Sequence, residues 1–115
     1  MAIKRIGAGK GMSQAVVGDT IYLAGQVADR AAGESVAAQT RAILTKIDRL
    51  LHEAGSDKSK LLMAHIRLAD MATFAEMNAE WDAWVSEGQT PGRATVEAEL
   101  ASPEHAVEIA VIAAR

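Results

Sequence analysis

The sequence predicts an α+β domain in which two helices cover one face of a β-sheet, in the order β-β-β-α-β-α-β-β. Segments rich in β-branched residues, with alternating apolar positions, recur along the chain and are typical of strands. Between them lie two longer segments whose apolar residues recur at helical spacing. The expected elements, in chain order, span residues 3–6, 13–17, 20–24, 35–54, 61–68, 73–85, 93–100 and 107–113.

Turn and cap residues support these boundaries. Residues 18–19, Gly-Asp, form the two-residue turn of a hairpin. Ser35 is a suitable N-cap for the first helix, and Gly55 is the glycine that commonly follows a helix C-terminus. The second helix is expected to begin with a capping box, in which the Thr73 and Glu76 side chains each accept from the other's backbone N–H.

The last segment is apolar at almost every position. Val107, Ile109 and Val111 fall on one face of the expected strand, and Ala110 and Ile112 fall on the other. A strand that is apolar on both faces is usually buried on both. Because the two helices can cover only one face of the sheet, a second copy of the chain is the natural cover for the other. We therefore predict a homo-oligomer.

Length and composition narrow the class of protein further. The 115 residues are close to the size of one domain, so we predict a single domain over residues 1–115. The formal net charge is −3 with no basic block, which argues against a nucleic-acid partner. There is no cysteine, which excludes disulfides and a catalytic thiol and fits a reducing cytoplasm. No apolar run suits a membrane span or a secretory signal, so we expect a cytoplasmic protein without a membrane partner.

Two charged residues stand out in the last quarter of the chain. Arg93 opens one expected strand directly after the Pro-Gly turn at residues 91–92, and Glu108 lies near the start of the last, apolar strand. Charges in such strands are costly unless they are paired or used. If the two strands are neighbours, both side chains line one polar pocket. The three histidines show no metal-ligand spacing, so no metal is expected.

Six short pieces of the chain follow one another in a characteristic order and spacing. They are Ala24-Gly25-Gln26, Ala38-Gln39-Thr40, Ala54-Gly55, Phe74-Ala75-Glu76-Met77-Asn78, Pro91-Gly92-Arg93 and Val107-Glu108-Ile109. Together they resemble the RidA/YjgF-type reactive-intermediate deaminases over most of the chain. The resemblance implies a chorismate-mutase-like fold and a homotrimer whose sheets face inward as a barrel. It also implies ligand pockets in the clefts between subunits.

The resemblance further implies an activity and the residues that perform it. The activity is a cofactor-free hydrolysis of enamines and imines derived from amino acids, which gives 2-oxo acids and ammonia. Arg93 matches the arginine that grips the substrate carboxylate, a task that suits a guanidinium because it donates two hydrogen bonds in a fixed geometry. Glu108 matches the glutamate that holds or activates a water at the imine carbon. Asn78 matches an asparagine beside the pocket.

Three further residues are expected to bind substrate. Gly25 and Gln26 follow the third strand and shape a pocket wall, where Gly25 lets the backbone approach the ligand. Thr95 lies two residues beyond Arg93 and therefore on the same strand face. Its backbone or hydroxyl is placed to help hold an acidic or carbonyl ligand.

Each of the main assignments has a structural alternative. Arg93 can pair with Glu97 or Glu99 on its own strand. Glu108 can be an ion-pair partner of Arg93 that is needed only for structure. Asn78 can make a local hydrogen bond on the second helix.

Two departures from the family pattern leave a second function open. Active members usually carry a tyrosine in the early loop, where residues 10–13 contain no aromatic, and a serine where this chain has Ala24. The alternative is a non-catalytic trimer that binds a small carboxylate or 2-oxo acid without turnover. The RNA cleavage or translation inhibition attributed to some relatives is a third function, and the acidic composition argues against it.

Overall fold

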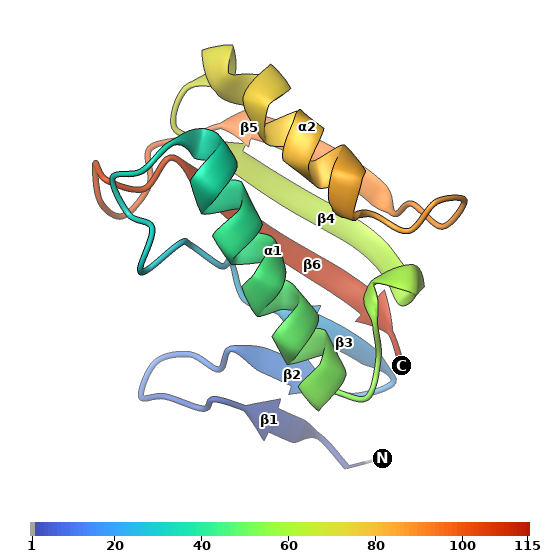
Figure 1. Ribbon diagram of the computed structural model, residues 1–115. Helices are drawn as coiled ribbons and strands as arrows, with labels where there is room; N and C mark the ends of the chain where they lie inside the picture. Colours follow the sequence, from blue (N-terminus) through green and yellow to red (C-terminus); the bar gives the residue numbers. More distant parts are fainter. Residues whose placement is uncertain (1) are drawn as a thin grey trace.

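The computed structural model describes residues 2–115, and its elements follow the predicted order (Figure 1). Met1, which the predicted domain includes, lies outside the described residues. Two short 3-10 turns, η1 and η2, precede β4 and α2. The elements are β1 Lys4–Ile6, β2 Ala15–Val17, β3 Thr20–Leu23, α1 Val36–Glu53, η1 Lys58–Lys60, β4 Leu61–Leu68, η2 Met71–Thr73, α2 Phe74–Trp84, β5 Gly92–Glu97 and β6 Val107–Ala114.

The six strands form one mixed sheet in the order β1-β2-β3-β6-β4-β5. β4 lies between β5 and β6, parallel to β5 and antiparallel to β6. The predicted pocket shared by Arg93 and Glu108 required β5 and β6 to be neighbours. They are not neighbours, so this condition is not met within one chain. β5 and β6 are separated because β4, α2 and β5 form a crossover unit in which the two parallel strands are adjacent. β5 therefore occupies one edge of β4, and β6 pairs with the other edge.

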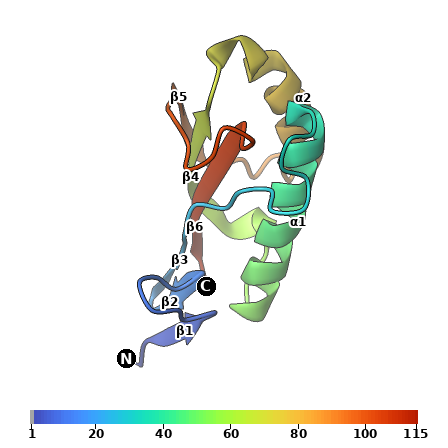
Figure 2. The ribbon, with the colours of Figure 1, turned by 90° about the vertical axis from the view of Figure 1, so that its left-hand side faces the viewer.

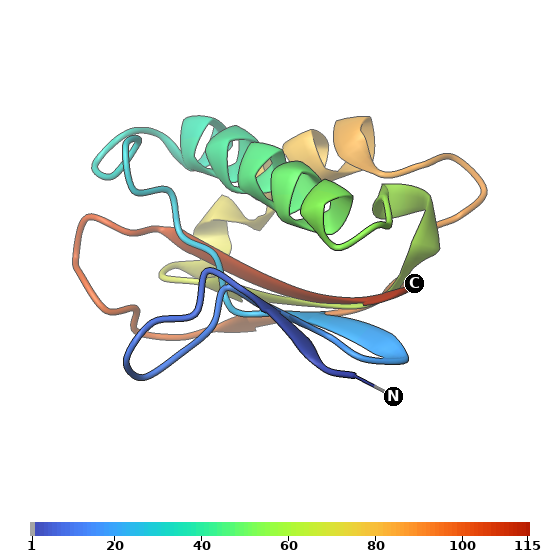
Figure 3. The same ribbon diagram turned by 90° about the horizontal axis from the view of Figure 1, so that it is seen from below.

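Both helices lie on the same face of the sheet, as predicted (Figures 2 and 3). This helix face contains the core, because alternate residues of β4 and β6 point into it and are buried against the apolar stripe of α1. The largest of its fully buried apolar side chains are Ile21, Ile43, Ile47, Leu51, Ile66, Leu68, Met77 and Ile109.

The opposite face of the sheet carries no helix, and we call it the open face (Figure 3). On β6 it presents Glu108, Ala110 and Ile112, which are half-buried and alternate with the fully buried core residues. Tyr22 of β3 pairs in register with Ile112 and is 53% exposed. An apolar sheet face left uncovered in one chain fits the predicted homo-oligomer, which stays a prediction.

The first helix begins and ends as the sequence predicts. The Ser35 hydroxyl accepts a hydrogen bond from the Ala38 backbone N–H at 3.1 Å. Gly55 follows the helix with a φ of +82°, a conformation that glycine adopts without strain.

The capping box predicted for the second helix is wrong. Thr73 makes no side-chain cap hydrogen bond to α2, and its hydroxyl donates to the Asp70 carbonyl. Glu76 accepts a hydrogen bond at 2.8 Å from the backbone N–H of Ala37, in the first turn of α1. A carboxylate is favourable at any helix N-terminus, and the packing of the two helices brings the end of α1 within reach of Glu76.

Candidate functional site

Arg93 lies at the start of β5, and its side chain points to the helix face. Its register partner is the buried Ala64 of β4, and parallel partners share a face of the sheet. The guanidinium carbon is 5.5 Å from the ring centre of Phe74 and 5.7 Å from that of Trp81, both on α2. Cations pack favourably against aromatic rings at such distances, so the two rings hold Arg93 at this edge of the sheet.

Asn78 fixes the orientation of this guanidinium. Its amide oxygen accepts from Nη1 of Arg93 at 2.6 Å, and its amide nitrogen donates to Asp82 one helical turn later at 3.3 Å. The structure thus brings together two of the residues that the sequence assigns to the pocket. Among residues 2–115 it records no ion pair between Arg93 and Glu97, whose carboxylate accepts instead from the Met71 backbone N–H at 2.8 Å.

Thr95 shares the helix face with Arg93, as its spacing predicts. Its register partner is the buried Ile66 of β4. The Thr95 hydroxyl is enclosed and has no hydrogen-bond partner among residues 2–115. A buried hydroxyl without a partner is uncommon, and because this oxygen is enclosed, the described residues do not present it to an outside ligand.

Glu108 points to the open face, near the start of β6. Its register partner is Arg67 of β4, and Nη1 of Arg67 donates to Oε2 of Glu108 at 3.2 Å. The two side chains are 42% and 29% exposed, Arg67 being the more accessible. Glu108 therefore pairs with Arg67 and not with Arg93, the partner that the structural alternative named.

Gly25 and Gln26 lie beside Glu108, and they play different parts. A Cβ atom on Gly25 would come within 2.8 Å of the Glu108 carboxyl carbon, so a larger residue here would push this carboxylate out of its position. Gln26 exchanges two backbone hydrogen bonds with Ile109, at 2.8 and 3.0 Å. The Gln26 side chain is 1% exposed and donates to the Gln14 side chain and to the Ala24 carbonyl. Gln26 thus reaches the site through its backbone, while its side chain ties the early loop to the sheet.

Arg93 and Glu108 lie on opposite faces of one chain's sheet. Arg93 aligns with Ala64 and Glu108 aligns with Arg67, three residues further along β4. Positions an odd number apart on a strand face opposite sides. A single chain therefore cannot bring both charges to one ligand.

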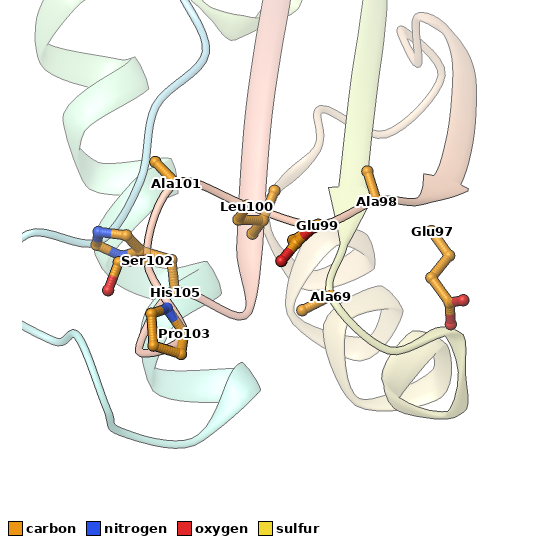
Figure 4. Close-up of a pocket in the computed structure, with 9 residues that line it drawn as sticks. All are labelled: Ala69, Glu97, Ala98, Glu99, Leu100, Ala101, Ser102, Pro103 and His105. Carbon is orange, nitrogen blue, oxygen red and sulfur yellow. The ribbon is translucent and has the colours of Figure 1, made fainter.

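The hollows of the single chain lie elsewhere. A cavity of about 620 Å³ is lined by the segment after β5 and by Ala69 at the end of β4, and neither Arg93 nor Glu108 reaches it (Figure 4). A smaller hollow of about 320 Å³ lies beside Gly25, with Met12 on its rim. Met12 belongs to the early loop that lacks the family tyrosine, and the same hollow is lined by Lys46 and Arg49 of α1 and not by Glu108.

Sequence reasoning missed two residues that shape the site. The sequence around Arg67 does not indicate a functional role, because its contact with Glu108 depends on the register of β4 against β6. Gln39 of α1 is 1% exposed, and its side chain binds the carbonyls of Glu34 and Glu104 and the N–H of Ala106. It anchors the segment that leads into β6. Gln39 belongs to one of the pieces that carry the family resemblance, which was the available clue.

Two general properties of the chain complete the description. Within residues 2–115 no group of three or more His, Cys, Asp or Glu side chains is arranged to hold a metal ion. None of the helices formed by these residues is both long and apolar enough to cross a membrane.

A mixed sheet with two helices on one face defines the class: the protein has the chorismate-mutase-like α+β fold. The family model described as Endoribonuclease L-PSP matches residues 2–115. The chain is 43% identical over 114 residues to a RutC family protein of Haemophilus influenzae, covering 98% of each chain. It is 44% identical to the RutC family protein YoaB of Escherichia coli K12, covering 99% of each.

A solved structure agrees with these sequence matches. NMB1025 of Neisseria meningitidis, a member of the YjgF protein family, superposes with a TM-score of 0.96 at 48% identity. The match covers 100% of this chain and 96% of NMB1025. The chain belongs to the RidA/YjgF family, whose members are also called RutC or L-PSP proteins.

Proposed function

We propose that this protein hydrolyses reactive imines and enamines derived from amino acids, without a cofactor and in the cytoplasm. Water adds to the C=N carbon of a 2-imino acid, and the nitrogen takes up a proton. The resulting carbinolamine then expels ammonia and leaves a 2-oxo acid. The uncatalysed reaction is already feasible in water, so positioning and modest acid–base assistance are enough.

The observation that carries this proposal is the way Arg93 is held. Asn78 uses one N–H of the guanidinium at 2.6 Å, and the guanidinium carbon lies 5.5 Å from the Phe74 ring centre and 5.7 Å from that of Trp81. No other hydrogen bond or ion pair of this side chain is recorded among residues 2–115. The remaining donors are fixed in direction and available, which is what two-pronged binding of a carboxylate requires.

Glu108 supplies the second part of the site. Its Oε2 is taken by Arg67, and its carboxyl group lies against the space that Gly25 leaves free. A carboxylate with one oxygen anchored and the other accessible is suited to orient a water for attack on the imine carbon.

The pocket that unites these residues lies between subunits in this proposal. Arg93 and Glu108 face opposite sides of the sheet in one chain, so two different chains have to contribute them. The uncovered apolar open face provides the surface through which subunits associate, and we propose the homotrimer of the family resemblance.

The second candidate is a trimer that binds 2-oxo acids without turnover. It is favoured by the early loop, where Met12 borders the hollow beside Gly25 and no aromatic is present. Ala24 also offers no hydroxyl. RNA cleavage, which the description of the family model names, is disfavoured by the net charge of −3.

The test separates turnover from binding through Glu108→Gln. An imine is generated in situ from an amino acid, and its decay is followed with wild type, with the variant and with buffer. We expect Glu108→Gln to lower turnover about 10²- to 10⁴-fold, the usual value of a positioned acid–base group. Affinity for a 2-oxo acid should change little, because the amide has the same shape. Equal decay in all three samples would leave the binding trimer as the better description.

A further inference from the structure

We propose that Arg67 is a positioning residue of this site, which balances the charge of Glu108 when an anionic substrate binds beside it. The inference rests on the proposed function for the identity of the ligand. It goes beyond the proposed function by giving a role to a residue outside the pieces of sequence that carry the family resemblance.

The contact between the two residues is direct. Arg67 and Glu108 are register partners on β4 and β6, and both side chains emerge on the open face. Nη1 of Arg67 lies 3.2 Å from Oε2 of Glu108. This is the only ion pair recorded for either side chain among residues 2–115.

The surroundings of the pair are almost free of other charge. On the side away from β6, the register partner of Arg67 is Val96 of β5. The preceding residue of β4 on the same face is His65, whose partner on β6 is Ala110. Gly25 of the loop after β3 lies against the Glu108 carboxyl group and brings no charge. Among residues 2–115 the ion pair recorded for Glu108 is the one with Arg67.

The chemistry of the substrate makes this compensation necessary. In a 2-imino acid the imine carbon is bonded directly to the carboxylate carbon. A glutamate that holds water at the imine carbon therefore lies close to the substrate carboxylate. Two carboxylates sharing a desolvated site cannot both stay ionised unless cations offset them. Arg93 offsets the substrate carboxylate, and Arg67 offsets Glu108.

The experiment compares wild type with Arg67→Met and Arg67→Lys. Binding of a 2-oxo acid is measured by calorimetry in two buffers of different ionisation enthalpy, which reports the protons taken up. Imine turnover gives kcat and KM. Arg5→Met is the matched control. Arg5 is the register partner of Val16, which in turn pairs with Tyr22, so all three lie on the open face. Arg5 is on β1, four strands away from β4, and is therefore an open-face arginine distant from Glu108.

We expect wild type to take up almost no proton when the ligand binds. Arg67→Met should take up a substantial fraction of one proton or bind at least about 10-fold more weakly, the scale of a lost hydrogen bond to a charged group. Its kcat should fall by a similar factor, and by more than its KM rises. Arg67→Lys should restore most of both, because the observed contact is a single donor that an ammonium can supply.

Unchanged proton uptake and unchanged affinity in Arg67→Met would overturn the assignment. Equal effects of Arg67→Met and Arg5→Met would overturn it too, since they would show a general effect of surface charge. Failure of the proposed function looks different. In that case wild type binds 2-oxo acids without accelerating imine decay, and the proton measurement still tests Arg67.

Discussion

The two faces of the sheet are made from alternate residues of the same strands, yet they differ in how completely one chain finishes them. On the helix face Ile109 and Ile66 are buried to 1% exposure or less, and Arg93 has a partner in Asn78. On the open face Tyr22 is 53% exposed, and Arg67 and Glu108 form an ion pair beside the apolar Val96 and Ala110. The helix face is a completed core, whereas the open face leaves apolar side chains uncovered in the single chain, as the predicted homo-oligomer requires.

This difference shows why the two charged residues behave differently. Arg93 is held by groups of its own chain, namely Asn78, Phe74 and Trp81. Glu108 has only Arg67 to hold it, and the rest of its surroundings depend on what covers the open face. Substitutions on each face, and one at a site away from both, test this difference.

The largest effect is expected on the open face from Ile112→Asp. If another subunit covers this face, the variant buries an unpaired charge, which costs several kcal/mol per site and counts three times in a trimer. Light scattering should show a monomer, and circular dichroism should show a folded chain. Ile3→Asp, at a position that is 57% exposed near the N-terminus, is the control. A wild-type chain that is monomeric at micromolar concentration would contradict the predicted oligomer.

Trp81→Ala tests the completed core of the helix face. Trp81 is 4% exposed, so its loss should cost about 3–5 kcal/mol. Trp84 is half-buried and donates to Asp48 at 3.0 Å, so Trp84→Ala should cost less. Denaturant melts measure both. A loss below about 1 kcal/mol for Trp81→Ala would be at odds with a buried ring.

Arg93→Ala tests whether the helix face supplies the carboxylate grip. We expect binding of pyruvate or 2-oxobutyrate to weaken about 10- to 100-fold, the scale of hydrogen bonds to a charged group. Arg93→Lys should also bind poorly, because an ammonium cannot reproduce the two-pronged contact. Arg41→Ala removes an arginine whose partner is Glu80 on α2, and it should leave affinity unchanged. Calorimetry that gives one affinity for all four proteins would refute the role of Arg93.

The smallest effect is expected away from both faces, at Asp29. Lys46 donates a hydrogen bond to Asp29 at 2.7 Å and thereby lowers the pKa of that carboxyl below its usual 3.8. A lowered pKa contributes stability above the unfolded value, and this contribution is lost as the pH falls through the folded value. Because Asp29 is 69% exposed, Asp29→Asn should cost about 0.5 kcal/mol or less at neutral pH. A double-mutant cycle with Lys46→Met isolates the pair, and a cost that persists unchanged in acid would contradict the assignment.

The order of the helices and strands, and the side of each that is apolar, could be predicted from local sequence. Ser35 and Gly55 mark the ends of α1, and the alternation of β6 separates its two faces, because caps and side-chain periodicity are local properties of the backbone. Asn78 and Arg93 were assigned to one site from sequence, and the structure joins them at 2.6 Å.

The neighbours of each strand became known from the assembled sheet. It placed β4 between β5 and β6, set Arg67 opposite Glu108, and turned Glu76 from the expected capping box to the N-terminus of α1. Strand order and register depend on how whole elements pack. The local sequence around a residue therefore does not indicate which distant residue will lie opposite it. For the same reason, the separation of Arg93 and Glu108 onto opposite faces became visible only once the sheet was assembled.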